Sequence, residues 1–242
     1  MTSSESGSGG RGEPSSSESG SGGRGEPSSV AWLRGAADDG FDPGYEGPTT
    51  IVLLRHGRTV LNAEHRLQGR LNPPLDEVGI EQAEAVGALI RDRWNVDRAV
   101  TSPSLRARQT LEHGGFADVP TTVDERFAEI DYGMAEGWPV EEAISSLAWG
   151  WARDVHYEPP GGGESLASLS ERVRAACDDL LASPAGEVVL VATHATPVKA
   201  AVVWALGGDA SMILRLHVSQ ASLSAIGQTP IGLVVFTYNE QP

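Results

Sequence analysis

Three short apolar runs, each followed by a helical pattern, constrain the fold of this chain more than any other feature. The runs are strand-like in length and composition and cover residues 50–54 (TIVLL), 98–101 (RAVT) and 187–192 (EVVLVA). Strands that alternate with helices form largely parallel sheets, because each crossover helix returns the chain to the same edge and covers one face of the sheet. The sequence therefore predicts an α/β fold.

Two segments carry the apolar spacing of an amphipathic helix. In residues 75–94 the apolar positions fall at i, i+3, i+4 and i+7, and Asp76 is the expected N-cap. Residues 165–183 repeat the pattern. The faces that we expect to be buried consist of Ala83, Val86, Gly87 and Ile90 in the first helix and Leu169, Val173, Ala176 and Leu180 in the second.

The C-terminal part of the chain has the pattern of two strands. Residues 222–240 contain two β-prone runs, with a turn expected at 228–232 (QTPIG). Such a hairpin adds an antiparallel edge to a parallel sheet. The expected fold class is therefore a three-layer α/β/α arrangement around a mixed, mostly parallel sheet.

An internal repeat separates the N-terminal part from the rest. Residues 3–15 (SSESGSGGRGEPS) recur unchanged at 16–28. A segment of Ser, Gly, Glu, Arg and Pro cannot bury enough apolar surface to offset its chain entropy. We expect a disordered low-complexity tail at 1–29, a linker at 30–48 and one domain at 49–242.

Charge and cysteine content limit the possible partners. The formal net charge of −15 argues against a nucleic-acid partner, although it permits a small basic pocket. A single cysteine, Cys177, rules out a disulfide within the chain and a thiolate metal cluster. The most apolar window, 188–206, contains His194, Pro197 and Lys199, so it reads as strand, turn and helix. We expect a cytoplasmic protein without a membrane or nucleic-acid partner; the sequence is silent on its oligomeric state.

Histidines and arginines follow the predicted strands at the point where each strand ends. Arg55 and His56 follow the first run, and His194 follows the third. Arg106 lies in the first turn of the helix expected after the second run. In an open α/β sheet, ligands bind beyond the carboxyl ends of the strands. These four side chains are therefore expected to meet in one pocket.

An anion would justify burying two arginines together. The guanidinium fork matches the oxygens of a phosphate or carboxylate, and histidines suit proton transfer or a covalent bond to that anion. Gly57 would let backbone and ligand approach closely, and the Thr59 hydroxyl and Asn62 amide would face the same anion. A metal site competes for these residues, but no ligand spacing such as HExxH is present and arginine would repel a cation, so we expect neither metal nor cofactor.

Five segments resemble, in order, the motifs of the histidine phosphatase superfamily, also called the phosphoglycerate-mutase-like group. They are LRHGRTVLNAEHRLQGRLNPPLDEVG, TSPSLRARQT, FAEIDYGMAEG, PPGGGES and VATHATP, and the match covers about residues 49–238. The resemblance implies a phosphoglycerate mutase-like fold. It is closest to the α-ribazole phosphatase and acid phosphatase branch, and within it to the phosphatase half of proteins that join ribonuclease H to an acid phosphatase.

The resemblance implies a division of chemical roles. His56 would be the nucleophile that forms a phosphohistidine, and Glu129 would protonate the leaving oxygen and later activate water. Asp131 is the rival acid. In the phytase-like branch the acid directly follows the second histidine, where this chain has Ala195. That difference favours Glu129.

The resemblance also implies how substrate is bound. The phosphoryl oxygens would be held by three side chains, with an amide assisting, and two further residues would lie near the rest of the substrate. The phosphoryl set is Arg55, Arg106 and His194 with Asn62, and the further residues are Gln68 and Gly69. Ala195 replaces a common glycine, but its backbone N–H can still donate to substrate unless the position requires positive φ. Ala135 stands where many members have an aromatic residue, which affects substrate preference.

Three functions remain open at this stage. The first is a metal-independent phosphatase of small phosphomonoesters, either α-ribazole phosphate or a broad range of substrates. The second is a phosphoglycerate mutase, which needs extra covering segments to keep the phosphoenzyme dry, and few residues are available for such a cover. The third is a non-catalytic phospholigand-binding domain, which predicts that a histidine, an arginine or the acid is missing; all are present.

Overall fold

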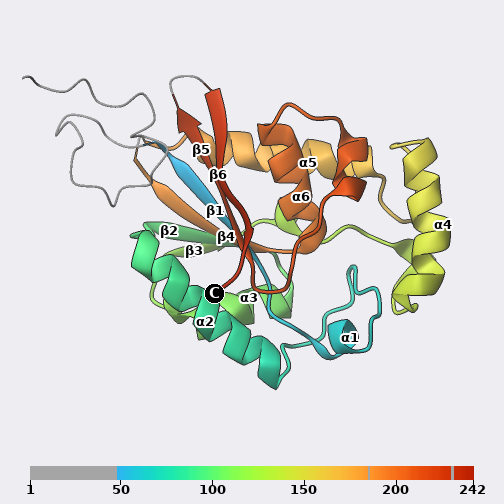
Figure 1. Ribbon diagram of the computed structural model, residues 1–242, viewed down its shortest axis with the longest axis horizontal. Coiled ribbons are helices and arrows are strands. Elements are labelled where there is room, and N and C mark those ends of the chain that lie inside the picture. Colours follow the sequence, from blue (N-terminus) through green and yellow to red (C-terminus); the bar gives the residue numbers. More distant parts are fainter. Residues whose placement is uncertain (1–47, 185, 230–231) are drawn as a thin grey trace, which may run out of the picture.

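The computed structural model describes residues 48–184, 186–229 and 232–242. The expected tail at 1–29 and all but the last residue of the expected linker at 30–48 lie outside this part of the chain, as do two residues of the expected turn at 228–232. The described residues form the α/β fold that the sequence predicts (Figure 1).

The centre of the fold is one six-stranded sheet with the order β3-β2-β4-β1-β5-β6. Neighbouring strands among β1 to β4 pair in parallel, whereas β5 pairs antiparallel with β1 and β6 antiparallel with β5. The mixed, mostly parallel sheet and its antiparallel edge are therefore confirmed. The strands are β1 (Thr50–Arg55), β2 (Arg98–Thr101), β3 (Thr121–Val123), β4 (Val188–Thr193), β5 (Leu223–Thr229) and β6 (Gly232–Glu240).

Helices cover both faces of the sheet, which makes the arrangement three-layered. In Figure 1, α5 and α6 lie on one side of the sheet, α2 and α3 on the other, and α4 stands apart to the right. The helices are α1 (Val60–Ala63), α2 (Glu77–Arg93), α3 (Leu105–Leu111), α4 (Val140–Arg153), α5 (Leu166–Leu181) and α6 (Ala195–Ala205). Among the described helices, none is both long enough and apolar enough to cross a membrane.

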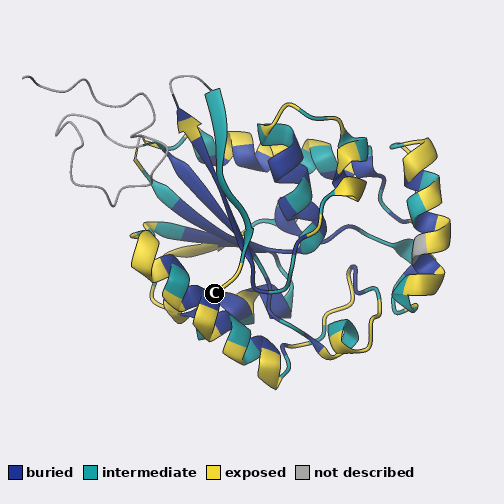
Figure 2. Cartoon of the chain, in the orientation of Figure 1, coloured by how far each residue is buried: buried dark blue, intermediate teal, exposed yellow. Residues whose placement is uncertain are grey.

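Strand β1 is buried on both sides, as the central strand of a parallel sheet must be. Ile51 and Leu53 belong to the core that also contains residues of α4, α5 and α6, whereas Val52 and Leu54 belong to the core beneath α2 and α3. Because successive side chains of a strand point to opposite faces, one continuous apolar run supplies both cores. Figure 2 shows the central strands β1 and β4 as mostly buried.

The predicted elements agree closely with the observed ones. Strands β1, β2 and β4 begin and end within one residue of their expected limits, whereas β5 extends two residues into the expected turn. The Asp76 carboxylate caps α2 by accepting the Gly79 N–H at 2.8 Å. All eight positions predicted for the buried helix faces are buried. Three of the helices and strands given above had no prediction: β3, a three-residue strand with exposed side chains, the short helix α1, and α4.

Candidate active site

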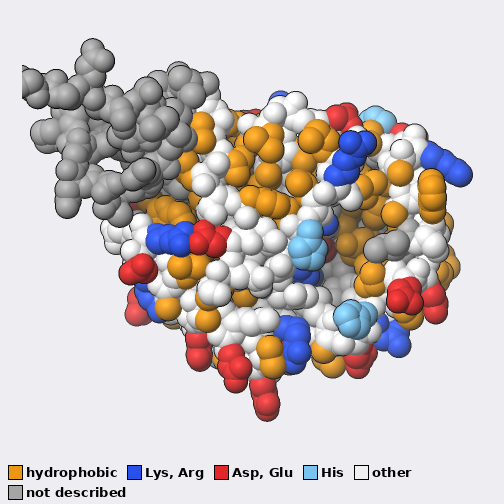
Figure 3. Space-filling model, viewed as in Figure 1, with side chains coloured by type: hydrophobic (Ala, Val, Ile, Leu, Met, Phe, Trp, Pro, Cys, Tyr) orange, Lys and Arg blue, Asp and Glu red, His pale blue; other side chains and the backbone are white. Residues whose placement is uncertain are grey.

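The candidate residues lie just past the carboxyl ends of neighbouring strands. Arg55 ends β1 and is followed by His56; Thr193 ends β4 and is followed by His194. β2, β4 and β1 are adjacent and parallel, so their carboxyl ends lie together. In Figure 3 the surface is hollowed to the right of centre, on the side where Figure 1 places α1 and α4.

His56 is buried and has a defined tautomer. Its Nδ1 lies 2.7 Å from the carbonyl oxygen of Gly57, which can only accept, so Nδ1 carries the proton and Nε2 presents a lone pair. The Nε–H of Arg106 donates to that Nε2 at 3.2 Å. Burial, followed by the charges of Arg106 and Arg55, holds the pKa of His56 well below its ordinary value of 6.5. His56 is therefore a neutral imidazole at neutral pH.

His194 lies edge-on to His56, with ring centroids 5.1 Å apart. Its Nε2 is 2.7 Å from the Ser102 hydroxyl and 3.3 Å from that of Ser104. Burial, together with the charge of Arg106, holds the pKa of His194 well below its ordinary value. The two histidines that are 138 residues apart in the sequence thus share one buried site.

The Arg106 guanidinium is almost completely buried beside the histidines, with 1% of the residue exposed. Besides His56, it donates to the carbonyl oxygens of Leu71 at 2.7 Å and Gly69 at 2.9 Å. Burial lowers the pKa of Arg106 to about 10, so the group remains a cation at neutral pH. Gly69, one of the predicted substrate residues, therefore touches the catalytic cluster through its carbonyl oxygen.

Two buried polar atoms of this cluster have no hydrogen-bond partner among the described residues. They are Nδ1 of His194 and Nε of Arg55. The Arg55 side chain is otherwise anchored, because its Nη1 donates to the carbonyl oxygen of Val218. Buried polar atoms are nearly always paired, so two unpaired ones in the same cluster indicate a place for a polar ligand.

Glu129 lies directly beside the second histidine. Its residue is 7% exposed, and Oε1 accepts the backbone N–H of Ile130 at 2.9 Å and of Thr196, in the first turn of α6, at 3.3 Å. The rival acid, Asp131, instead uses its carboxylate to accept the N–H of Gly133 at 2.8 Å. Of the two carboxylates, Glu129 is thus the one bound to the segment that carries His194.

Thr59 and Asn62 are hydrogen-bonded to each other, and their contact with a shared anion stays a prediction. The Thr59 hydroxyl accepts the Asn62 N–H at 3.3 Å, and the Asn62 amide oxygen accepts the Thr59 N–H at 3.2 Å, which caps α1 at its N-terminus. The Thr59 hydroxyl also donates to the Gln68 side chain at 3.0 Å. In this structure, therefore, the three predicted residues hold the loop around α1.

Gly57 lies where the structure has no room for a Cβ, whereas Ala195 lies where a side chain is tolerated. A Cβ on Gly57 would collide with the Gly79 carbonyl oxygen of α2, so the absence of a side chain lets this helix approach closely. The close approach of a ligand at Gly57 stays a prediction. Its N–H donates to the Thr110 hydroxyl at 3.1 Å. Ala195 begins α6 with a φ that is not positive, so an alanine fits where the family often has glycine.

Sequence reasoning missed four polar residues of this region: Ser102, Tyr132, Thr196 and Lys199. The phenol of Tyr132 hydrogen-bonds with the Thr196 side chain, and burial, together with the charge of Glu129, raises its pKa. Lys199, half-buried on α6, has a pKa lowered by burial. Ser102 could have been found, since it directly follows β2 as the histidines follow β1 and β4.

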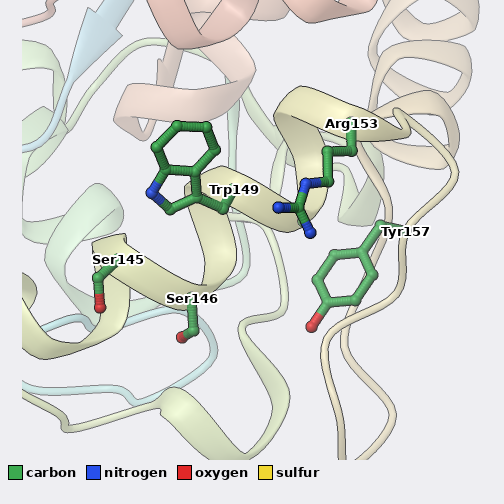
Figure 4. A pocket seen from close by; sticks show the side chains of 6 residues that line it. Ser145, Ser146, Trp149, Arg153 and Tyr157 are labelled. Atoms are coloured by element: carbon green, nitrogen blue, oxygen red, sulfur yellow. The ribbon is translucent and has the colours of Figure 1, made fainter.

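A separate pocket of about 510 Å³ lies on α4 and the segment after it (Figure 4). Its lining consists of Ser145, Ser146, Trp149, Gly150, Arg153 and Tyr157, none of which belongs to the cluster around His56. Over the described part of the chain, no group of three or more His, Cys, Asp or Glu side chains could hold a metal ion.

Comparison with known proteins identifies a family and several related proteins. The family model described as "Histidine phosphatase superfamily (branch 1)" matches residues 51–241. "Bifunctional protein Rv2228c" of Mycobacterium tuberculosis is 36% identical over 197 residues, which cover 78% of this chain but 54% of that protein. The chain thus spans about half the length of this relative.

Two further matches cover most of the other protein. "Probable phosphoglycerate mutase GpmB" of Yersinia enterocolitica is 32% identical over 181 residues, which are 73% of this chain and 83% of that protein. The solved structure of mycobacterial glucosyl-3-phosphoglycerate phosphatase Rv2419c with VO3 is 25% identical, with a TM-score of 0.70. That match covers 80% of this chain and 100% of the other.

Proposed function

The chain belongs to the histidine phosphatase superfamily, branch 1, and we propose that it hydrolyses small phosphomonoesters without a metal ion, through a phosphohistidine at His56. One observation carries this proposal: buried His56 contacts both His194 and Arg106, and Nδ1 of His194 and Nε of the neighbouring Arg55 have no partner among the described residues. A phosphoryl group would supply the oxygens that those atoms lack.

The first chemical step follows from the tautomer of His56. With the proton held on Nδ1, the lone pair of Nε2 attacks phosphorus and the P–O bond to the leaving alcohol breaks. Arg106 would exchange its contact with Nε2 for the phosphoryl oxygens, together with Arg55 and His194. Cations and donors already in place stabilise the charge that develops on those oxygens, usually the largest contribution to catalysis.

Glu129 would act in both halves of the reaction. In the first half its carboxyl group gives a proton to the leaving alcohol; in the second its carboxylate takes a proton from the water that attacks the phosphohistidine. Phosphate then leaves and the starting protonation states return. The Ser102 hydroxyl can donate to Nε2 of His194, which leaves the proton of that imidazole on Nδ1. Nδ1 could then donate a hydrogen bond to a phosphoryl oxygen, as the scheme requires.

The substrate class is a small phosphorylated metabolite. The phosphatase match favours phosphorylated sugar acids, and the resemblance favours α-ribazole phosphate or a broad range of phosphomonoesters. The match to GpmB, over 83% of that protein, keeps phosphoglycerate mutase as the second candidate.

Phosphate release in the presence of a chelator tests the proposal. We expect the protein to release phosphate from a panel of these metabolites with EDTA present, and His56→Ala to lower kcat by about 10³-fold or more. With 3-phosphoglycerate, release of phosphate supports the hydrolase and formation of 2-phosphoglycerate supports the mutase. Loss of all turnover in EDTA, or full activity in His56→Ala, would overturn the proposed chemistry.

A further inference from the structure

The loop 159–165 (PPGGGES) has no role in the proposed reaction, yet it is bound to the segment that carries Glu129. The N–H of Glu164 donates to the carbonyl oxygen of Asp131 at 2.9 Å, and the N–H of Met134 donates to that of Pro160 at 2.8 Å. Two backbone hydrogen bonds therefore fasten this loop to residues that follow Glu129 by two and five positions.

The two segments are in close contact between those hydrogen bonds. Gly133 has a φ of +59°, which disfavours any other residue, and a Cβ there would collide with the carbonyl oxygen of Pro160. Glycine at this position thus permits the approach of the backbones. Their separation is set by backbone atoms, which cannot move as a flexible side chain can.

Arg172 of α5 reaches the same segment from the other side. Its Nε and Nη2 donate to the two carboxylate oxygens of Glu164 at 2.6 Å and 2.8 Å. Its Nη1 donates to the carbonyl oxygen of Arg126 at 2.6 Å, and Nη2 lies 3.4 Å from that of Glu129. One guanidinium thus joins the loop to the backbone carbonyl oxygens of Arg126 and Glu129.

The geometry of this ion pair suits precise positioning. Two parallel N–H···O bonds fix both the distance and the plane of the partners, which a Lys could not do. The side chains are only 17% and 12% exposed, so solvent screens the pair weakly. Removing one partner would leave a poorly hydrated charge, which makes any alternative arrangement costly.

We propose that Arg172 and Glu164 are positioning residues that hold the Glu129 carboxyl group in line with the leaving oxygen. The proposal rests on the proposed role of Glu129 as the acid. Neither residue touches the cluster around His56, and both act through the backbone of residues 126–131. This backbone must be held rigidly because proton transfer requires the Glu129 carboxyl group to lie within hydrogen-bond distance of the leaving oxygen.

The test compares substrates whose leaving groups differ in their need for a proton. For the Arg172→Met variant, we expect kcat/KM to fall about 10²-fold with phenyl phosphate but less than about threefold with 2,4-dinitrophenyl phosphate, which leaves as a stable anion. The kcat/KM value is used because it reports phosphoryl transfer to His56 and not hydrolysis of the phosphoenzyme. Glu164→Gln, which keeps the side-chain volume, is expected to show the same selectivity in milder form.

Arg98 and Glu187 provide a matched control. Their side chains also form a two-point ion pair, at 2.9 Å and 3.1 Å, but join the amino-terminal ends of β2 and β4. Arg98→Met removes a similar pair at the opposite end of the parallel strands. Its loss of kcat/KM should be equal for the two substrates, and thermal unfolding of every variant shows that the comparison is made on folded protein.

The outcomes separate this proposal from the one on which it rests. If Glu129→Gln is selective for phenyl phosphate and Arg172→Met is not, the positioning role is wrong and the acid role stands. If Glu129→Gln is not selective, the acid assignment fails and this proposal fails with it. Equal losses for both substrates, or unfolding of both Arg172→Met and Glu164→Gln, would assign the pair to stability alone.

Discussion

The two buried histidines are the residues on which the proposed chemistry depends, and the fold keeps both neutral. Burial is the largest cause of the lowered pKa at His56 and at His194, and the neighbouring guanidinium groups add to it. A protonated His56 would have no lone pair for phosphorus. Together with burial, the arginines that would bind substrate therefore also keep His56 in the neutral form that the proposed attack requires.

This suppression of the histidine pKa predicts how stability depends on pH. In the unfolded chain a histidine takes up a proton near pH 6.5, whereas His56 and His194 do so only at lower pH when folded. Between those values the unfolded state binds more protons, so stability falls as pH decreases. At pH 5 the loss reaches up to about 2 kcal/mol per histidine, and above pH 6.5 it vanishes.

Urea unfolding at pH 7.5 and pH 5.0 measures this loss. The difference in the free energy of unfolding should shrink in His56→Asn/His194→Asn, while the exposed His156→Asn keeps the wild-type difference. An unchanged difference in the double variant would mean that the two histidines titrate normally and contradict the electrostatic argument.

The sequence shows the site residues that follow strands more clearly than those that lie in loops and helices. His56, His194 and Arg55 stand at strand ends, where topology alone brings them together. Tyr132 and Lys199 have no such marker, because their positions depend on how a loop and a helix pack around the sheet. Thr59 shows a local role that the spacing did not indicate: its hydroxyl caps α1, and its contact with substrate stays a prediction.

At the scale of elements, α2 shows what periodicity can and cannot predict. The i, i+3, i+4, i+7 pattern identified the buried face, including Gly87. It could not show why one of those positions is glycine. A Cβ on Gly87 would collide with backbone atoms of Gly114, so α2 lies directly against the turn that follows α3. The short strand β3 lacked any pattern, because its three side chains are exposed.

The Gly87→Ala variant tests this contact, since two effects oppose each other. Helix propensity alone would stabilise the protein by up to about 1 kcal/mol. The collision with Gly114 is instead expected to destabilise it by about 1–3 kcal/mol, because backbone atoms cannot move aside cheaply. Denaturant unfolding decides the sign, and Glu84→Ala on the exposed face of α2 should change stability by less than about 0.5 kcal/mol. A gain in stability for Gly87→Ala would show that the helix can move away.

At the scale of the whole molecule, the sheet brings segments that are distant in the sequence together at the carboxyl ends of its parallel strands. The two cores lie on opposite faces, while the carboxyl ends of β1, β2 and β4 remain available for polar residues. This division separates stability from chemistry. It also explains why fold class was predictable from strand and helix patterns, whereas the identity of a substrate depends on loops whose packing no periodicity describes.

A covalent phosphoryl group on His56 is the central claim, and a rapid-quench experiment with a ³²P-labelled substrate tests it most directly. We expect label that survives alkali but is lost in acid, on a peptide containing His56. With labelled 2,4-dinitrophenyl phosphate, whose leaving group needs no proton, Glu129→Gln should carry more label because only hydrolysis of the intermediate slows. His56→Ala should carry none. Acid-stable label, or label that persists in His56→Ala, would contradict this account.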